Sequence, residues 1–179
     1  MEEQQSVLTE RQDVLAERQD VLVVDQEINF IENFINKKVK VGRGGPESKS
    51  GYLLGVYSDY VILWTDKKEI VYYQSAHTHS MTLDSTATES IKGEDGLDSL
   101  TYVHEDSFVS TIGALKHNMV QINKGGPDCL TGVIVEANDN YFTISIEKEI
   151  IFVFVQHVKS ISLAPKENKN DDNKNENSN

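Results

Sequence analysis

The most informative absences in this chain of 179 residues are those of cysteine, of long apolar stretches and of a secretory signal. A single cysteine, Cys129, excludes an intramolecular disulfide and a cysteine-rich metal cluster. The longest apolar run, residues 150–155, has the length of a strand and falls far short of the roughly 20 residues that a membrane-spanning helix needs. The N-terminus is acidic and polar, whereas a secretory signal is basic and then apolar. Synthesis and retention in the cytoplasm, with no membrane partner, are therefore expected.

Basic charge is also scarce, and this argues against nucleic acid as a partner. Asp and Glu number 29 against 17 Lys and Arg, and the formal net charge is −12. Because phosphate backbones are bound mainly through Lys and Arg, the bulk charge disfavours nucleic-acid binding. The hydrophobic content of 38% nevertheless predicts a folded core.

What the sequence does contain is an internal repeat. Residues 39–47 recur 81 positions later as residues 120–128, and each segment carries Gly-Gly-Pro followed by an acidic residue. One residue is then lost, and the match continues at an offset of 80, so that His77 corresponds to His157 and Leu83 to Leu163. A match in order over about 55 residues with one gap predicts a duplicated module.

Each copy has the pattern of a short helix followed by five short strands. Asp25 is a candidate N-cap for the helix of the first copy, and Ser107 for that of the second. Alternating apolar residues predict the strands, and Gly-Gly-Pro ends the first strand because Pro cannot donate to a ladder. The expected fold class is mainly β with short helices: two tandem small SH3-like or Sm-like barrels, each preceded by a helix.

Composition further divides the chain into five segments. Near the N-terminus Val-Leu pairs recur every seven residues, which predicts an amphipathic helix that leans on the first barrel, with a dimeric coiled coil as the alternative. The segments are this helix (1–24), the first module (25–83), an acidic linker (84–104), the second module (105–164) and a disordered tail (165–179).

The candidate functional residues are the two repeated turns and the apolar strands of the second copy. A strand on each side of each turn argues against a phosphate-binding loop. The turns consist of Arg43, Gly44, Gly45, Pro46 and Glu47 in the first copy and of Lys124, Gly125, Gly126, Pro127 and Asp128 in the second. Exposed strand edges recruit other strands, and residues 150–155 and 158–163 are the edge candidates. Within them the possible assembly edge consists of Ile151, Val153 and Val155.

Catalytic and metal chemistry find little support. His77 and His79 would face one side of a strand, a spacing that can bind zinc, but only His77 has a counterpart in the second copy, so no metal or other cofactor is expected. Cys129, if exposed, could cross-link to another protein, or it could be an unreactive thiol. No Ser/His/Asp or paired-carboxylate arrangement is repeated in both copies, so neither enzymatic activity nor a small-molecule substrate is expected.

Two stretches resemble the repeat of the spore coat protein B family. The first is residues 43–51 (Arg-Gly-Gly-Pro-Glu-Ser-Lys-Ser-Gly) followed by Ser-Asp-Tyr at 58–60, and the second is residues 157–163 followed by Pro-Lys. The resemblance covers residues 28–83 and 105–166. It implies a structural component of the outer spore coat, synthesised in the mother-cell cytoplasm. Through the exposed strand edges such a component is expected to bind other coat proteins or further copies of itself. Some members carry a long, phosphorylated Ser/Lys/Arg-rich C-terminal region, and that function is not expected here because the tail has only Ser178.

An Sm-like RNA-binding protein is the alternative. RNA binding would require clustered basic residues beside aromatic stacking positions. The first copy offers a cluster, and the second has only two basic residues at equivalent places: Lys37, Lys38, Lys40 and Arg43 against Lys116 and Lys124.

Overall fold

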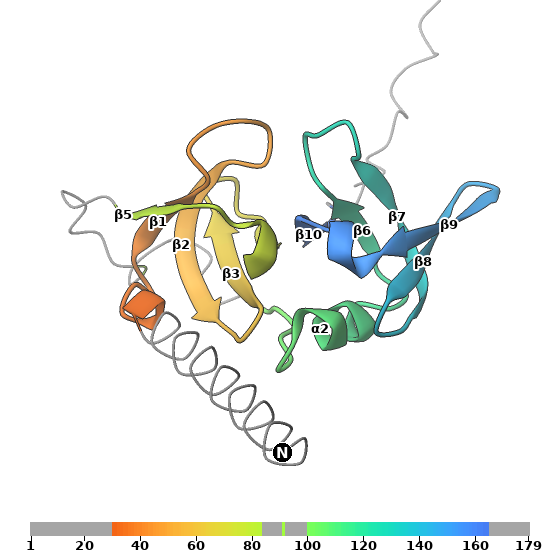
Figure 1. Cartoon of the computed structure of the whole chain (residues 1–179), viewed down its shortest axis with the longest axis horizontal. Coiled ribbons are helices and arrows are strands. Elements are labelled where there is room, and N and C mark those ends of the chain that lie inside the picture. Colours follow the sequence, from red (N-terminus) through yellow and green to blue (C-terminus); the bar gives the residue numbers. More distant parts are fainter. Residues whose placement is uncertain (1–29, 84–90, 92–99, 165–179) are drawn as a thin grey trace, which may run out of the picture.

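The computed structural model describes residues 30–83, 91 and 100–164 (Figure 1). Residues 30–83 are called the first half and residues 105–164 the second half. The strands of the first half are β1 (Lys38–Val41), β2 (Lys49–Val56), β3 (Tyr60–Thr65), β4 (Ile70–Gln74) and β5 (Met81–Leu83). Those of the second half are β6 (Met119–Ile122), β7 (Leu130–Ala137), β8 (Tyr141–Ile146), β9 (Glu149–Phe154) and β10 (Ser160–Leu163). The other elements are helix α2 (Phe108–Ala114) and the 3-10 turns η1 (Ser75–His77) and η3 (Val155–His157).

The predicted mainly β fold with short helices is confirmed, but the prediction of two tandem barrels is wrong. The ten strands form one antiparallel sheet in the order β5-β1-β2-β3-β4-β10-β6-β7-β8-β9, which is not closed into a barrel. The reason is that one side of β4 pairs with β10 of the other half, while β5 has β1 as its one partner strand in the described part of the chain. The strand edges that would close each barrel are therefore used to join the halves or are left at the ends of the sheet.

Each half has the same strand order and the same register. Val39 faces Gly51 in the first half, and Val120 faces Gly132 at the corresponding place in the second. The second strand of each half also has a register shift against the strand that follows it. Gly51 is required by close approach, because a Cβ atom there would lie 2.1 Å from the backbone oxygen of Trp64.

The helix boundaries follow local sequence chemistry. Ser107 is the N-cap of α2 as predicted, and its side chain accepts a hydrogen bond from the Ser110 amide at 3.1 Å. Residues 30–32 are helical in the first half, whereas the predicted cap at Asp25 lies outside the described residues. So do the predicted N-terminal helix (1–24), the tail (165–179) and most of the linker. None of the described helices has the length and apolar character that crossing a membrane would demand.

The buried side chains form two main cores. One core lies within the first half and includes Val39, Leu53 and Leu63. The other belongs to the second half and includes Phe142 and Ile144, but Tyr60, Ile62 and Tyr72 of the first half are also part of it. The two halves are thus joined by shared apolar packing as well as by strand pairing.

Candidate functional site

The first feature of functional interest is the contact between β4 and β10, called the junction. Tyr72 faces Ile161 across it, and the Gln74 amide donates to the Lys159 carbonyl at 3.1 Å. On its other side β10 pairs with β6. The prediction that residues 158–163 form an open edge is therefore wrong, because a strand paired on both sides offers no free backbone groups.

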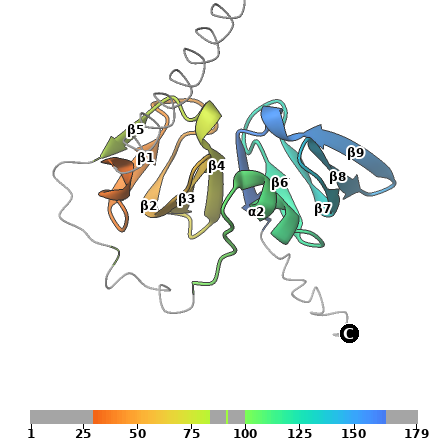
Figure 2. The ribbon, with the colours of Figure 1, turned by 60° about the horizontal axis from the view of Figure 1, so that its bottom comes forward.

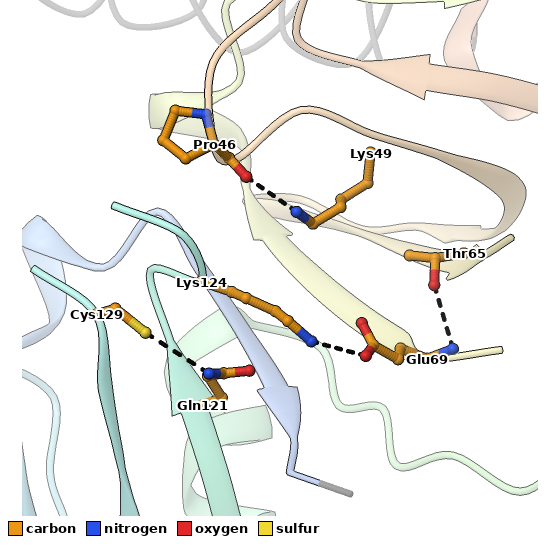
Figure 3. Close-up of polar contacts among 7 residues, drawn as sticks. All are labelled: Pro46, Lys49, Thr65, Glu69, Gln121, Lys124 and Cys129. Carbon is orange, nitrogen blue, oxygen red and sulfur yellow. Dashed lines mark hydrogen bonds and ion pairs between the residues drawn. The ribbon is translucent and has the colours of Figure 1, made fainter. Parts of the chain in front are cut away.

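The two repeated turns meet at the junction, on the side shown in Figure 3. A Cβ atom added at Gly125, which has a φ of +94°, would lie 3.0 Å from both the Cβ and the carbonyl oxygen of Pro46. The Lys49 ammonium donates to that same carbonyl at 2.9 Å. Residue 125 thus needs glycine for its backbone conformation and for the closeness of the other turn.

Two carboxylates of the first half make polar contacts with the second half. The Lys124 ammonium lies 2.7 Å from Glu69 Oε1, and the Ser160 hydroxyl donates to Glu47 Oε2 at 2.6 Å (Figure 3 shows the former). The second oxygen of each carboxylate, Glu47 Oε1 and Glu69 Oε2, is buried without a hydrogen-bond partner among the described residues. Since a buried charge is costly unless it is paired, these contacts help to fix the register of the junction.

The members of the predicted turns therefore have different surroundings. Pro46, Glu47, Lys124 and Gly125 are brought together at the junction. Arg43 and Gly44 lie away from these contacts and, together with Pro46 and Glu47, line a depression of about 610 Å³. Gly45, Pro127 and Asp128 are exposed, and Gly126 is half-buried.

A tyrosine network next to the junction was missed by the sequence reasoning. Tyr60 donates its hydroxyl hydrogen to the Glu105 carbonyl at 2.6 Å and accepts from the Thr111 hydroxyl at 3.0 Å. Tyr72 donates to the Val103 carbonyl at 2.8 Å. These bonds tie the segment before α2 to β3 and β4. One feature of the sequence does point to such a network: Thr111 is a polar residue on the otherwise apolar face of a helix, and a buried hydroxyl needs a hydrogen-bond partner.

Burial raises the pKa of the tyrosines in this network. Burial is the main cause for Tyr57, whose pKa rises to about 12, with the nearby Tyr60 and Tyr102 adding to the effect. The pKa values of Tyr60 and Tyr72 are raised for the same main reason. Tyr57 and Tyr60 stack with ring centroids 4.5 Å apart. The cluster therefore stays neutral well above the pH at which an exposed tyrosine ionises.

The second feature of interest is the pair of strands β5 and β9, which lie at opposite ends of the sheet and of the molecule (Figure 2). Among the described residues each of them pairs with a strand on one side alone, and their other sides are called the open edges. The outward side chains of β9 are exposed and apolar: Ile150 at 55%, Phe152 at 60% and Phe154 at 55%. The residues predicted as the assembly edge alternate with them. Ile151 and Val153 are half-buried, and Val155 is buried in η3.

The remaining candidate side chains are those of His77, His79 and Cys129. Within the described ranges, no three His, Cys, Asp or Glu side chains are grouped so that they could hold a metal ion. His77 Nε2 lies 2.8 Å from the Gln156 carbonyl oxygen and so bridges the two halves. Cys129 is half-buried, and its Sγ accepts from Gln121 Nε2 at 3.6 Å (Figure 3).

Fold and site together describe a β-sheet protein whose halves are joined edge to edge and whose outer strands, β5 and β9, are unpaired on one side within the described ranges. No family model matches the chain. Over 147 residues, 82% of its length, the chain is 35% identical to spore coat protein B of Bacillus subtilis (strain 168). The chain is homologous to that protein, which confirms the resemblance seen in the sequence. It spans 38% of the length of this curated relative.

Proposed function

We propose that this chain is a non-enzymatic structural component of the bacterial spore coat and that it acts there as a protein–protein assembly module. The observation that carries the assignment is the 35% identity to spore coat protein B over 82% of the chain. The resemblance of the turn at residues 43–51 points the same way. Synthesis in the mother-cell cytoplasm and deposition on the spore follow from this placement.

The two halves are proposed to be copies of one module, with boundaries at 25–83 and 105–164. Their support is the sequence match at offsets of 80 and 81 together with the same strand order in each half. A small module buries a limited fraction of its surface, so it gains stability by packing on another copy. The junction supplies that packing within one chain.

The assembly role is supported by the open edge β9. Edge strands in soluble proteins are usually protected by charge, by Pro or by a covering segment. In the run from Ile150 to Phe154 every residue is apolar, and three of the five side chains are exposed. Partners that add a strand to such an edge gain main-chain hydrogen bonds and bury these side chains. Other coat proteins and further copies of this chain are the proposed partners.

Imaging of a fluorescent fusion in sporulating cells tests the placement. The fusion is expected to form a shell of fluorescence around the developing spore and to stay with the purified spore. The fluorescent protein alone, expressed from the same promoter, is the control and should remain diffuse in the mother cell. A fusion that is diffuse like the control, although the full-length product is present, would overturn the proposed function.

A further inference from the structure

We propose that β9 of one molecule pairs with β5 of a second copy, in the way in which β4 pairs with β10 inside the chain. The inference rests on the proposed assembly function and deepens it, since it names the partner and the contact. By the offset of 80 residues that relates the two halves, β9 is the sequence counterpart of β4, and β10 is the counterpart of β5. Each molecule thus has one open edge of each kind that the junction brings together.

The backbone groups of the two open edges face the correct way for this pairing. On β9, the Val155 amide donates to the Asn140 carbonyl at 3.0 Å. Because hydrogen-bonding direction alternates along an antiparallel strand, the amide and carbonyl of Phe152 point away from β8. On β5, the Gly42 amide donates to the Ser80 carbonyl at 2.8 Å, so the same alternation makes the backbone groups of Met81 point away from β1.

The register of the junction brings these two residues together. Inside the chain Tyr72 faces Ile161. Phe152 is the counterpart of Tyr72, 80 residues later, and Met81 is the counterpart of Ile161, 80 residues earlier. The same register therefore pairs Phe152 of one molecule with Met81 of the next. The backbone groups of both residues point outward, so the transferred register satisfies the hydrogen-bonding pattern without a shift of either strand.

The polar contacts of the junction also have counterparts at the open ends. The Lys124–Glu69 ion pair corresponds to Arg43 of one molecule and Glu149 of the other. A basic residue again faces an acidic one. Both Arg43 and Glu149 are exposed in the single molecule. Likewise, the bond from Ser160 to Glu47 corresponds to Ser80 and Asp128, again a hydroxyl and a carboxylate. The ion pair and the hydrogen bond of the junction therefore each have a chemically equivalent pair at the proposed contact.

Apolar burial provides the driving force. Tyr72 is fully buried at the junction, whereas its counterpart Phe152 is 60% exposed at the open edge. Pairing with a second copy would place Met81 opposite Phe152, as Ile161 lies opposite Tyr72 at the junction. Because the two edges are different surfaces, the contact is head-to-tail, and each added molecule presents a new open β9. The products are rings if the rotation closes and filaments if it does not.

A reciprocal charge exchange tests the contact in the full chain. By sedimentation velocity from about 1 μM to 1 mM, the wild type is expected to form species larger than a dimer as concentration rises. The single variants Glu149→Lys and Arg43→Glu should each weaken association by about tenfold or more, because each places like charges in contact. An equimolar mixture of the two variants should recover wild-type association, since each supplies the complementary charge for the other.

Two further variants make the test specific. Phe152→Lys places a charge on the open edge and should abolish association, whereas Val135→Lys alters an exposed residue of the interior strand β7 and should leave it unchanged. A wild type that stays monomeric over the whole range overturns the inference, as does a mixture of folded charge variants that does not recover association. If a monomeric protein still locates to the spore coat, the head-to-tail contact is wrong and the proposed function stands.

Discussion

Lys124 and Glu69 form an ion pair of 2.7 Å across the junction between the two halves of the sheet. Their side chains are 27% and 18% exposed, so the pair is partly shielded from water. Glu69 Oε2 has no partner in the described part of the chain, which leaves Lys124 to compensate the carboxylate. The pair thus connects the loop before β4 to the turn after β6 and helps to define how the halves are aligned.

Loss of this lysine should destabilise the protein measurably. Lys124→Ala leaves a partly buried carboxylate without its counter-charge, and the free energy of unfolding is expected to fall by about 1–3 kcal/mol. Asp66→Asn is the matched control, because it weakens the more exposed Lys38–Asp66 pair (3.0 Å) and should cost about 1 kcal/mol or less. Urea denaturation measures both. Equal losses in the free energy of unfolding would show that the junction pair stabilises the protein no more than the exposed pair does.

Two glycine substitutions should have effects of opposite sign. Gly51→Ala would bring a Cβ atom to 2.1 Å from the backbone oxygen of Trp64, and the resulting strand displacement should cost about 1–3 kcal/mol or more. Gly113→Ala in α2 meets no atom within 4 Å and should stabilise the protein by about 0.5–1 kcal/mol through helix propensity. Thermal unfolding monitored by circular dichroism measures both changes. A Gly51→Ala protein as stable as the wild type would contradict the close packing of β2 on β3.

Alkaline pH should weaken the fold through the tyrosine network. Burial raises the pKa of Tyr57 to about 12 from an ordinary value of 10.0. Because the folded pKa is higher than the unfolded one, the unfolded chain releases its proton first. The contribution to stability is therefore complete below pH 10 and is lost as the pH rises towards 12. Urea unfolding measured across this interval should show the free energy of unfolding falling with pH. In the Tyr57→Phe variant this fall should be smaller.

Spectroscopic titration of the folded protein gives an independent check. Part of the tyrosinate absorbance of the seven tyrosines is expected to appear only as the pH approaches 12. Ionisation of all seven near pH 10, with the fold intact, would contradict the network around Tyr60.

The protein should not bind single-stranded RNA appreciably at about physiological salt, because its net charge of −12 repels a phosphate backbone. Fluorescence anisotropy with a labelled oligouridine measures this, with a basic RNA-binding protein as the positive control. Submicromolar affinity would favour the Sm-like alternative over a coat component.

Local elements could be predicted from the sequence, but the strands through which the two halves pair could not. The N-cap at Ser107 and the strands on either side of Gly-Gly-Pro depend on neighbouring residues, so they are visible in the pattern. Whether β4 pairs with residues 81–83 or 160–163 depends on contacts distant in sequence, such as the Lys124–Glu69 pair. Both segments have a strand-like composition, and nothing local distinguishes between them.

The outward face of β9 was undetermined for a related reason. Alternation reveals which side of a strand faces the core only when polar and apolar residues alternate. Every residue of the run 150–155 is apolar, so the sequence does not indicate which side chains face the core. The prediction places Val155 at the edge, whereas the structure buries it. The turns were recognisable from their repetition, whereas the contact between Pro46 and Gly125 required the fold.

The unequal make-up of the two cores bears on the order in which the protein is made. Among the described residues, the core of the first half consists of side chains from that half, whereas the core of the second half also includes Tyr60, Ile62 and Tyr72. Ribosomes release the N-terminal part of a chain first, and domains generally fold as they emerge. The first half can therefore be folded, with the free side of β4 presented, before residues 160–163 leave the ribosome. The later half then completes its core on a surface that already exists.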